Sequence, residues 1–287
     1  MQDLVNATTH AKKATVSQWC RIFGVSRSGL YAARKRCCRP KPVCALSVQA
    51  KAAFEASGQS YGSRCLSAAL KIQGLAVGRY QARTLMRSNG LRARWRRKFV
   101  HTTDSRHVLP VAANVLARHF NPEAPNLAWV GDITHVRTRT GWLYLAVVLD
   151  LFSRRVVGWS MAPSMPAQLV CAALGMAIAS RQTLPGLLVH SDRGSQYASQ
   201  DHTALLARHR LVCSMSRKGN CWDNAVMERF FLNLKMERVW QRDYANQAEA
   251  QADIADYIVG FYNPLRLHST LGYRSPAQYE QRFLANH

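Results

Sequence analysis

The chain has 287 residues, 48% of them hydrophobic, so it is long enough for a core of normal size and about two domains. It contains no run of about 18 uninterrupted apolar residues. We also expect no signal peptide, which predicts a cytoplasmic protein rather than a membrane protein. The formal charge is +23, and residues 1–110 alone carry a net charge of +18. Such one-sided charge predicts nucleic acid as the partner, with a membrane surface as the weaker alternative.

Residues 15–36 have the pattern of a helix, a turn and a second helix. Apolar side chains recur at helical spacing over residues 16–23, Gly24 marks the turn, and Ser26 is expected to cap the second helix. A helix-turn-helix unit places its second helix in the DNA major groove, whereas a plain helical pair is the structural alternative. Four side chains of the second helix could reach phosphates and base edges: Arg27, Ser28, Tyr31 and Arg34.

A second helical pair is predicted for residues 61–90, with breaks at Gly74 and Gly90. Its expected buried face consists of Leu66, Leu70, Leu75, Tyr80 and Leu85.

A basic run interrupted by Trp95 follows this pair. We expect the run to contact DNA, although a charge run can also be a solvated face. Its basic residues are Arg92, Arg94, Arg96, Arg97 and Lys98. The residues after it, 101–122, lack periodicity and are predicted to be a linker.

From residue 127 the pattern changes from helical to strand-like. Three consecutive hairpin-linked strands are predicted, and helices and strands then alternate. The expected strands are 127–138, 142–151, 155–162, 186–190 and 211–214, and the expected helices are 166–181, 201–210 and 223–240. This order, βββαβαβα, predicts an α/β layer sandwich. Residues 246–283 are expected to form a helix followed by an irregular segment that contains proline.

The eight cysteines include no C-x-x-C pair, so we expect reduced thiols that are mostly buried. Zinc binding by Cys37, Cys38 and Cys44 is the alternative. No second pair follows at zinc-finger spacing, which makes a plain structural role the preferred interpretation.

Three carboxylates in the α/β region form the candidate catalytic set. Asp132 lies inside a predicted strand, where an unpaired charge is costly, and Asp192 follows the end of a buried strand, where open α/β sheets place their sites. Glu228 lies near the start of the long helix with 35 residues between it and Asp192, and Lys235 follows two turns later on the same face. Taken singly, a salt bridge, a helix cap and a solvated helix face are the respective structural alternatives for the three carboxylates.

The triad resembles the D,D(35)E core of retroviral integrases and bacterial insertion-sequence transposases. The resemblance covers nearly the whole chain and is closest to the second-frame protein of the two-frame insertion-sequence family number three. It rests on residues 129–134 (WVGDIT), 190–197 (HSDRGSQY), 223–230 (DNAVMERF) and 262–271 (YNPLRLHSTL) with Ser275-Pro276, and on Tyr61-Gly62 and 85–91 (LMRSNGL) upstream. Gly131 and Ser63 depart from the family pattern without touching the triad.

The resemblance implies a ribonuclease H-like core, a mixed five-stranded sheet with helices, preceded by a basic all-α, helix-turn-helix-like region. It implies that neighbouring first and fourth strands bring Asp132 and Asp192 together. With Glu228 they would hold two Mg²⁺ or Mn²⁺ ions for phosphodiester cleavage and strand transfer. Lys235, Arg229 and Arg193 would contact the DNA backbone.

The implied partners are double-stranded DNA, both the terminal inverted repeats of the element and its target, and further copies of this chain on that DNA. A first-frame protein, or a frameshift fusion with it, is also implied, because no leucine-zipper heptads occur here. The implied location is the bacterial cytoplasm, at the nucleoid, with no membrane partner.

The family pattern predicts five segments. These are a helix-turn-helix-like DNA-binding segment (1–45), a second helical DNA-binding region (46–100), a linker (101–122), the integrase catalytic core (123–241) and a C-terminal helical tail (242–287).

Two other functions stay open. One is a non-catalytic DNA-binding regulator, and the other is a ribonuclease H-like nuclease that cleaves without joining. No covalent nucleophile is expected, although Tyr197 and Ser195 lie close to Asp192 in sequence. Structural or supporting roles are expected for His190, Asp150 and Asp223, and packing, with DNA contact as the alternative, for Tyr262, Asn263, Arg266 and His268.

Overall fold

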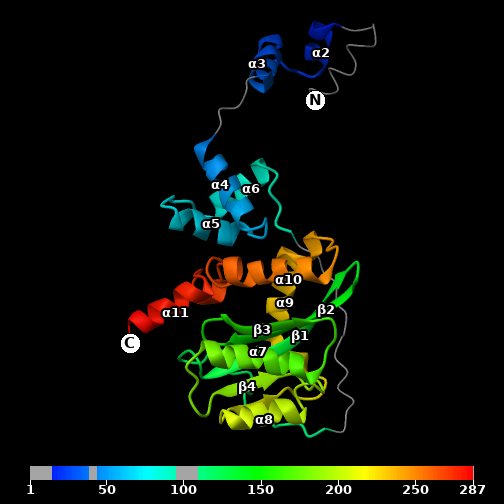
Figure 1. The fold of residues 1–287 in the computed structure, drawn as a ribbon. Helices are drawn as coiled ribbons and strands as arrows, with labels where there is room; N and C mark the ends of the chain where they lie inside the picture. Colours follow the sequence, from blue (N-terminus) through cyan, green and yellow to red (C-terminus); the bar gives the residue numbers. More distant parts are fainter. Residues whose placement is uncertain (1–14, 39–43, 95–108, 287) are drawn as a thin grey trace. The chain divides into compact units, whose positions relative to one another are not determined.

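A computed structural model describes residues 15–38, 44–94 and 109–286 (Figure 1). The chain divides into two compact units, Met1–Val48 and Gln49–His287, which we describe separately. Several predictions lie outside the described residues. These are the DNA contacts of Arg96, Arg97 and Lys98, the side chains of Cys37 and Cys38, residues 1–14 of the first predicted segment and residues 101–108 of the predicted linker.

The described part of the first unit contains the predicted helix, turn and helix. α2 (Val16–Ile22) begins at Thr15, whose side chain and backbone form a capping box with Gln18. Gly24 provides the turn with a φ of +62°, a conformation that glycine adopts without strain. In α3 (Arg27–Cys38) the Gly29 N–H donates to Ser26 Oγ at 3.0 Å, which confirms the predicted cap. Arg27, Ser28, Tyr31 and Arg34 are exposed on α3, and their contact with DNA stays a prediction.

A helical region of three helices follows: α4 (Ala45–Ala56), most of which belongs to the second unit, α5 (Ser63–Ile72) and α6 (Arg79–Ser88). The sequence did not delimit α4, whose Phe54 is buried. The predicted burial of Leu66 and Leu70 is confirmed, but that of Tyr80 is wrong, since its side chain is 81% exposed. The inward positions of α6 are Ala82 and Met86, four residues apart, and Tyr80 lies on the opposite side of the helix.

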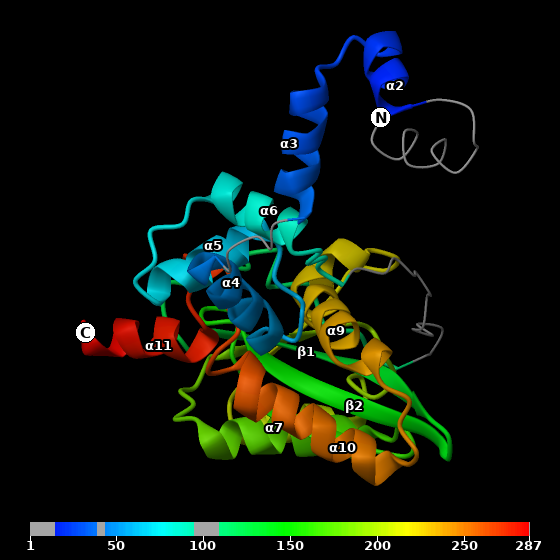
Figure 2. The same ribbon diagram turned by 90° about the horizontal axis from the view of Figure 1, so that it is seen from above.

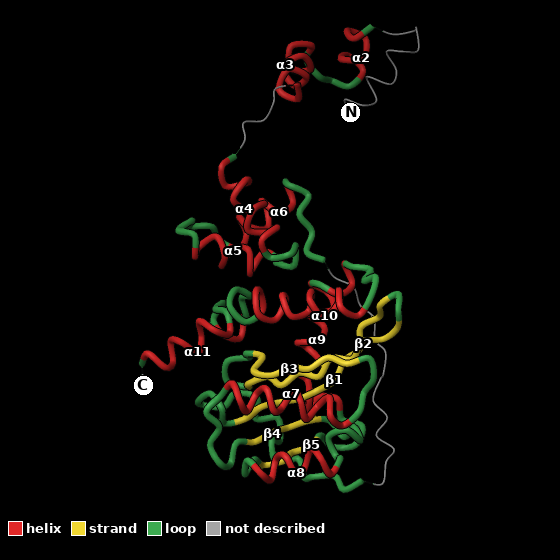
Figure 3. Tube along the Cα trace, in the orientation of Figure 1, coloured by secondary structure: helices red, strands yellow, loops and turns green. Residues whose placement is uncertain are grey.

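A five-stranded mixed sheet forms the centre of the second unit (Figure 3). Its strands are β1 (Ala128–Thr138), β2 (Gly141–Asp150), β3 (Val156–Ala162), β4 (Leu188–Ser191) and β5 (Val212–Met215), in the order β3-β2-β1-β4-β5. The first three pair antiparallel, and β4 pairs parallel with β1 and β5. The predicted strands and the ribonuclease H-like α/β fold are therefore confirmed, including the adjacency of the first and fourth strands.

Helices cover both faces of this sheet. Alternate residues along a strand point to opposite faces, and β2 accordingly places Leu145 and Leu149 in one core and Ala146 and Val148 in the other. On the face that carries Ala146 and Val148, α7 (Ala167–Ser180) approaches β3 closely. A Cβ at Gly158 would lie 2.2 Å from a carbonyl oxygen of this helix. Only glycine fits there. α8 (Gln200–Arg208) completes this layer (Figure 1).

The face of the sheet that carries Leu145 and Leu149 is covered by the helices that follow β5. The predicted long helix, residues 223–240, is three elements: a 3₁₀ turn η1 (Cys221–Asn224), α9 (Ala225–Glu237) and a second 3₁₀ turn η2 (Val239–Gln241). α9 lies against β1 (Figure 2). α10 (Gln247–Asp256) and a π-helical turn η3 (Tyr257–Tyr262) pack on the same core. Within the described ranges, no helix is long and apolar enough to cross a membrane.

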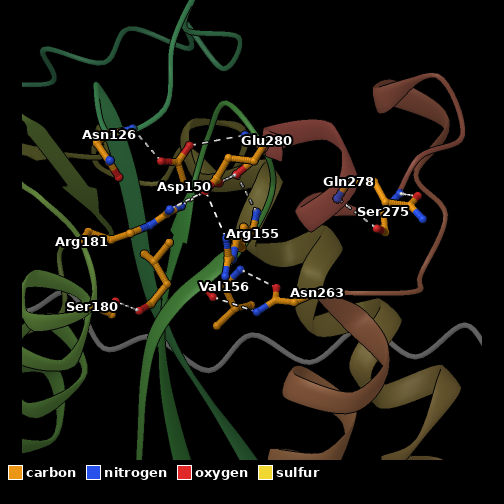
Figure 4. A network of polar contacts seen from close by, with 12 residues as sticks. Asn126, Asp150, Arg155, Val156, Ser180, Arg181, Asn263, Ser275, Gln278 and Glu280 are labelled. Atoms are coloured by element: carbon orange, nitrogen blue, oxygen red, sulfur yellow. Dashed lines mark hydrogen bonds and ion pairs between the residues drawn. The ribbon is translucent and has the colours of Figure 1, made fainter. Parts of the chain in front are cut away.

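The C-terminal segment corrects one prediction. After the 3₁₀ turn η4 (Ser269–Leu271), residues expected to be irregular form α11 (Pro276–Ala285), which Ser275 and Gln278 begin with a capping box. Glu280 of α11 is 2% exposed and accepts hydrogen bonds from Ser153 at 2.8 Å, from Arg155 at 3.1 Å and from both terminal nitrogens of Arg181 (Figure 4). These contacts tie α11 to the β2–β3 turn and the end of α7.

We expect Glu280→Gln to lower the free energy of unfolding by about 3–5 kcal/mol, because it leaves the buried side of Arg181 without its carboxylate. Burial opposes ionisation of Glu280, but hydrogen bonds from Arg181 hold its pKa below the ordinary value. Urea denaturation would measure the loss, with the exposed neighbour change Gln281→Ala as the matched control. Equal midpoints for the two variants would contradict this assignment.

Candidate active site

The register of two parallel strands brings the first two predicted carboxylates to one level. β1 and β4 pair through Val130 and His190. Asp132 lies two residues after Val130, and Asp192 lies two residues after His190. The two aspartates are therefore side by side, just beyond the last paired residues of strands that are about 4.8 Å apart. Asp132 accepts the N–H of Ile133 at 2.8 Å, and Asp192 accepts the N–H of Gly194 at 2.9 Å.

The pKa of Asp132 depends on the charges of the other candidate site residues. Burial raises the pKa of Asp132 well above its ordinary value, and the negative charges of Asp192 and Glu228 raise it further. The backbone hydrogen bond from Ile133 and the positive charge of Lys235 act in the opposite direction. The three predicted carboxylates and Lys235 therefore share one electrostatic environment.

Tyr197 forms a wall of this environment. Its side chain is 4% exposed, and its hydroxyl lies 3.5 Å from the point where a Cβ at Gly131 would be. Burial raises the pKa of Tyr197 well above its ordinary value, and the charges of Asp132 and Asp192 add to the effect. Tyr197 therefore stays protonated at neutral pH, and the expectation that no covalent nucleophile is used stays a prediction.

Helix α9 supplies the third carboxylate and the cation. Met227, Phe230 and Leu234 anchor one side of the helix in the core, which leaves Glu228 exposed near its first turn. Lys235, two turns later, is half-buried. Burial lowers its pKa, and the negative charge of Asp132 partly offsets that effect. The predicted placement of Glu228 and Lys235 toward Asp132 is consistent with these interactions.

Asp223 fixes the start of α9. Its carboxylate has no exposed surface and binds Arg118 at 2.8 Å and Arg217 at 2.7 Å. It also accepts hydrogen bonds from the Asn114 amide at 2.9 Å and the Arg217 backbone at 3.0 Å. Hydrogen bonds from Arg217 outweigh burial and hold the pKa of Asp223 far below its ordinary value. The segment before β1, the loop after β5 and the helix of Glu228 thus meet at one buried charge.

Comparison with known proteins now decides the family. Family patterns match at residues 122–221 (integrase core domain), 44–99 (HTH-like domain) and 209–276 (integrase core domain). Transposase InsF of insertion sequence IS3A from Escherichia coli is 42% identical over 282 residues, which cover 96% of this chain and 97% of InsF. The chain belongs to the IS3 family of transposases. An uncharacterized 31 kDa protein of insertion element IS600 from Shigella sonnei is also 42% identical, over 92% of this chain and 98% of that protein.

Solved structures with similarity to this IS3-family transposase include retroviral integrases. The simian T-cell lymphotropic virus intasome, solved with a regulatory subunit of protein phosphatase 2A, has a TM-score of 0.49 at 18% identity, over 75% of this chain and 70% of that one. The HTLV-2 integrase catalytic core, solved with magnesium, has a TM-score of 0.45 at 21% identity, over 56% and 99% respectively. The family membership and the integrase core domain establish the transposase as a DDE-type enzyme of DNA transposition with a DNA-binding region.

The HTH-like family domain of the transposase covers α4 to α6. The residue pattern had predicted the helix-turn-helix motif at the α2–α3 pair instead. The assignment of α2–α3 as a DNA-binding unit stays a prediction. Of the basic run after α6, Arg92 and Arg94 are described, and both are exposed. Among the other predicted DNA contacts Arg229 is exposed, whereas Arg193 is half-buried and donates from Nε to the Ser216 carbonyl at 2.6 Å.

The supporting residues of the transposase are structural. His190 is fully buried between the hydroxyls of Ser214 and Ser216, at 2.9 and 3.2 Å. Asp150 accepts N–H groups of Asn126 at 2.7 Å and Phe152 at 2.8 Å, and burial raises its pKa.

The motif that contains Tyr262 packs against the core, as the sequence predicts. Tyr262 is 1% exposed, and its hydroxyl donates to the Arg154 carbonyl at 3.1 Å. Arg266 forms a two-pronged ion pair with Glu237, and its NH1 lies 3.3 Å from His268 Nε2. These contacts give the motif a structural role without DNA.

The donor chemistry of the site suits a hard divalent cation. Carboxylate oxygens are the ligands that Mg²⁺ prefers, and the mutual repulsion around Asp132 is the condition that a cation relieves. Asn224 adds a buried amide, one turn before Glu228, for whose nitrogen and oxygen the described structure records no partner. However, no group of three His, Cys, Asp or Glu side chains among the described residues lies close enough together to hold a metal ion. The zinc alternative is not tested, because the side chains of Cys37 and Cys38 lie outside the described residues.

Proposed function

We propose that this transposase cleaves the phosphodiester bond at the ends of its element and joins those ends to target DNA, with Asp132, Asp192 and Glu228 as its metal ligands. The observation that carries the proposal is the common level of Asp132 and Asp192 on adjacent parallel strands, together with the charge of Glu228 acting on Asp132. A regulator that only binds DNA has no use for three carboxylates gathered in one electrostatic environment.

Two Mg²⁺ or Mn²⁺ ions would supply activation of the attacking hydroxyl or water and stabilisation of the leaving oxygen. Asp132 and Asp192 would hold the ions from the rigid sheet, and Glu228 would approach from the exposed face of α9. Lys235 would contact a phosphate of the bound strand and so position it against Asp132. Tyr197 would close the wall behind the carboxylates and keep water out, without forming a bond to DNA.

The DNA partners in this proposal are the terminal inverted repeats and the target duplex. The α2–α3 pair, the HTH-like domain, Arg92, Arg94, Arg193 and Arg229 would contact them. We further propose that several copies assemble on paired ends in the bacterial cytoplasm, with a first-frame protein or as a fusion with it. The five-segment division at residues 45, 100, 122 and 241 is part of the same proposal.

Strand joining tests the proposal. The substrates would be labelled duplexes of the repeats that flank the gene, in Mg²⁺, with wild-type protein and Glu228→Gln side by side. Because the substitution removes one ligand charge, we expect joining to fall by about a hundredfold or more while DNA binding stays unchanged. Glu123→Gln, a change of an exposed glutamate, is the matched control and should retain full activity.

The other outcomes separate the competing functions. Nicking without joining, unaffected by an added first-frame protein, would favour a nuclease. Binding without chemistry, equal in wild type and Glu228→Gln, would favour a regulator.

A further inference from the structure

Trp222 is exposed beside the candidate active site. Its side chain is 69% exposed, an unusual state for so large an apolar group, and it precedes Glu228 by six residues. The two residues that follow it, Asp223 and Asn224, are 1% and 5% exposed. Trp222 therefore projects into solvent directly before two buried residues.

The backbone that carries Trp222 is held firmly. Asp223 binds Arg118 and Arg217 through its buried carboxylate, and its N–H donates to the Asn220 carbonyl at 3.3 Å. Arg118 also donates to the Asn220 side chain at 3.0 Å. Since the backbone on both sides of Trp222 is fixed, the indole loses little conformational freedom when it binds a partner.

Several exposed cationic side chains belong to the cluster that holds the backbone of Trp222. The side chains of Arg118 and Arg217 remain 44% and 54% exposed outside their contacts with Asp223, and Lys218 is exposed. In sequence between Val212 and Val259, Trp222 is the only large hydrophobic side chain of the described residues that is strongly exposed, and Val115 is an exposed apolar residue of the segment that binds Asp223. A single aromatic plane among cations suits a nucleobase and its phosphates better than an apolar protein surface, which would need a continuous patch.

We propose that Trp222 stacks on a nucleobase that is unstacked at the end of the element, next to the phosphodiester that the carboxylates cleave. Arg217 and Lys218 hold the phosphates on either side of that nucleotide. Stacking accepts any base, so this contact positions the DNA end rather than reading its sequence. The inference rests on the proposed function, because it places the DNA end at Asp132, Asp192 and Glu228.

A thermodynamic cycle between the protein and the DNA tests the contact. Binding would be measured by fluorescence anisotropy with the full chain in the Glu228→Gln background, where no product forms. The probes would be repeat-end duplexes in which each nucleotide within three positions of the cleavage site is replaced in turn by an abasic one. The proteins would carry Trp222, Trp222→Phe, Trp222→Ala or the control Trp142→Ala, which removes a 46%-exposed tryptophan at the far end of the β1–β2 hairpin.

We expect Trp222→Ala to weaken binding of intact ends by roughly ten- to a hundredfold. Trp222→Phe should keep most of the affinity, and Trp142→Ala should have no effect. At one abasic position the DNA should bind the protein that has Trp222 as weakly as intact DNA binds Trp222→Ala. At that position Trp222→Ala should cause no further loss of affinity. Independent, multiplicative losses at every position would overturn the proposal, as would weakened self-association with unchanged DNA binding. Because this assay needs no catalysis, the stacking contact can be confirmed even if strand joining is not observed. Strand joining can likewise be observed even if the stacking contact is absent.

Discussion

Replacing Asp132 by Asn is expected to reduce strand joining by about a thousandfold or more, and yet to raise the melting temperature of the metal-free protein. Activity falls because Asp132 is the central carboxylate of the site. Stability rises because the buried charge of Asp132 faces Asp192 and Glu228, and the amide removes that repulsion. For a unit of this size, each kcal/mol of relieved repulsion corresponds to about 2–4 °C.

The pH dependence fixes the sign of this effect. The pKa of Asp132 is raised in the folded protein, so its contribution to stability is complete below the ordinary aspartate pKa of about 4 and is lost as the pH rises through the raised value. The advantage of Asp132→Asn should therefore be present at pH 7 and absent near pH 4. Added Mg²⁺ should reverse the order of the two proteins at pH 7, because only the wild type has the full ligand set.

Differential scanning fluorimetry at the two pH values, with and without Mg²⁺, measures these melting temperatures. Asp243→Asn is the matched control, because Asp243 is an exposed carboxylate paired with Arg139. It should alter neither the activity nor the response to metal. A metal-free Asp132→Asn protein that melts below wild type at pH 7 would contradict the assignment.

Two buried histidines, His190 and His202, and the half-buried His268 are expected to make the protein labile to mild acid. Burial lowers the pKa of His190 to about 4, of His202 to about 4 and of His268 to about 3. Each binds a proton more readily in the unfolded chain, so its contribution to stability is complete above about pH 6.5 and is lost as the pH falls toward 4. Each pKa unit corresponds to about 1.4 kcal/mol, so the loss is of the order of a few kcal/mol for each histidine.

Asp132 and Asp150 act in the opposite direction over part of this range, so single variants isolate the histidines. His190→Gln keeps an amide for Ser214 and Ser216 but cannot take up a proton. Urea denaturation between pH 7.5 and 4.5 should show its unfolding free energy falling less steeply than that of wild type, by about 1.4 kcal/mol per pH unit. Equal slopes would show that His190 does not titrate on unfolding.

The sequence predicted the strands of the sheet well, because they are short runs rich in Val, Ile, Trp and Tyr that turn residues separate. It predicted the position of Asp192 for the same reason, since the residue follows a short apolar strand. The common level of Asp132 and Asp192 was expected only through a family resemblance. Parallel register depends on strand pairing, which periodicity along the chain does not encode.

What the sequence missed are long-range contacts. Arg118 lies in a segment without periodicity, and its partner Asp223 is 105 residues away, so neither could be recognised as part of one cluster. Glu280 and Arg181 are separated by 99 residues and escaped for the same reason. The start of α11 was different. Ser275, Pro276 and Gln278 form a capping pattern that was present in the sequence and could have predicted the helix.

The amide of Asn263 bears on how copies of this chain can associate. β3 is an edge strand of the sheet, and Asn263 occupies both backbone groups of Val156, accepting from its N–H and donating to its carbonyl at 3.0 Å each. Ser180 donates to the neighbouring carbonyl of Val157 at 2.9 Å. Side chains thus take the place that another strand would fill. At this end of β3 the sheet therefore cannot grow by strand addition, so contacts between copies of this chain cannot form there by extending the sheet.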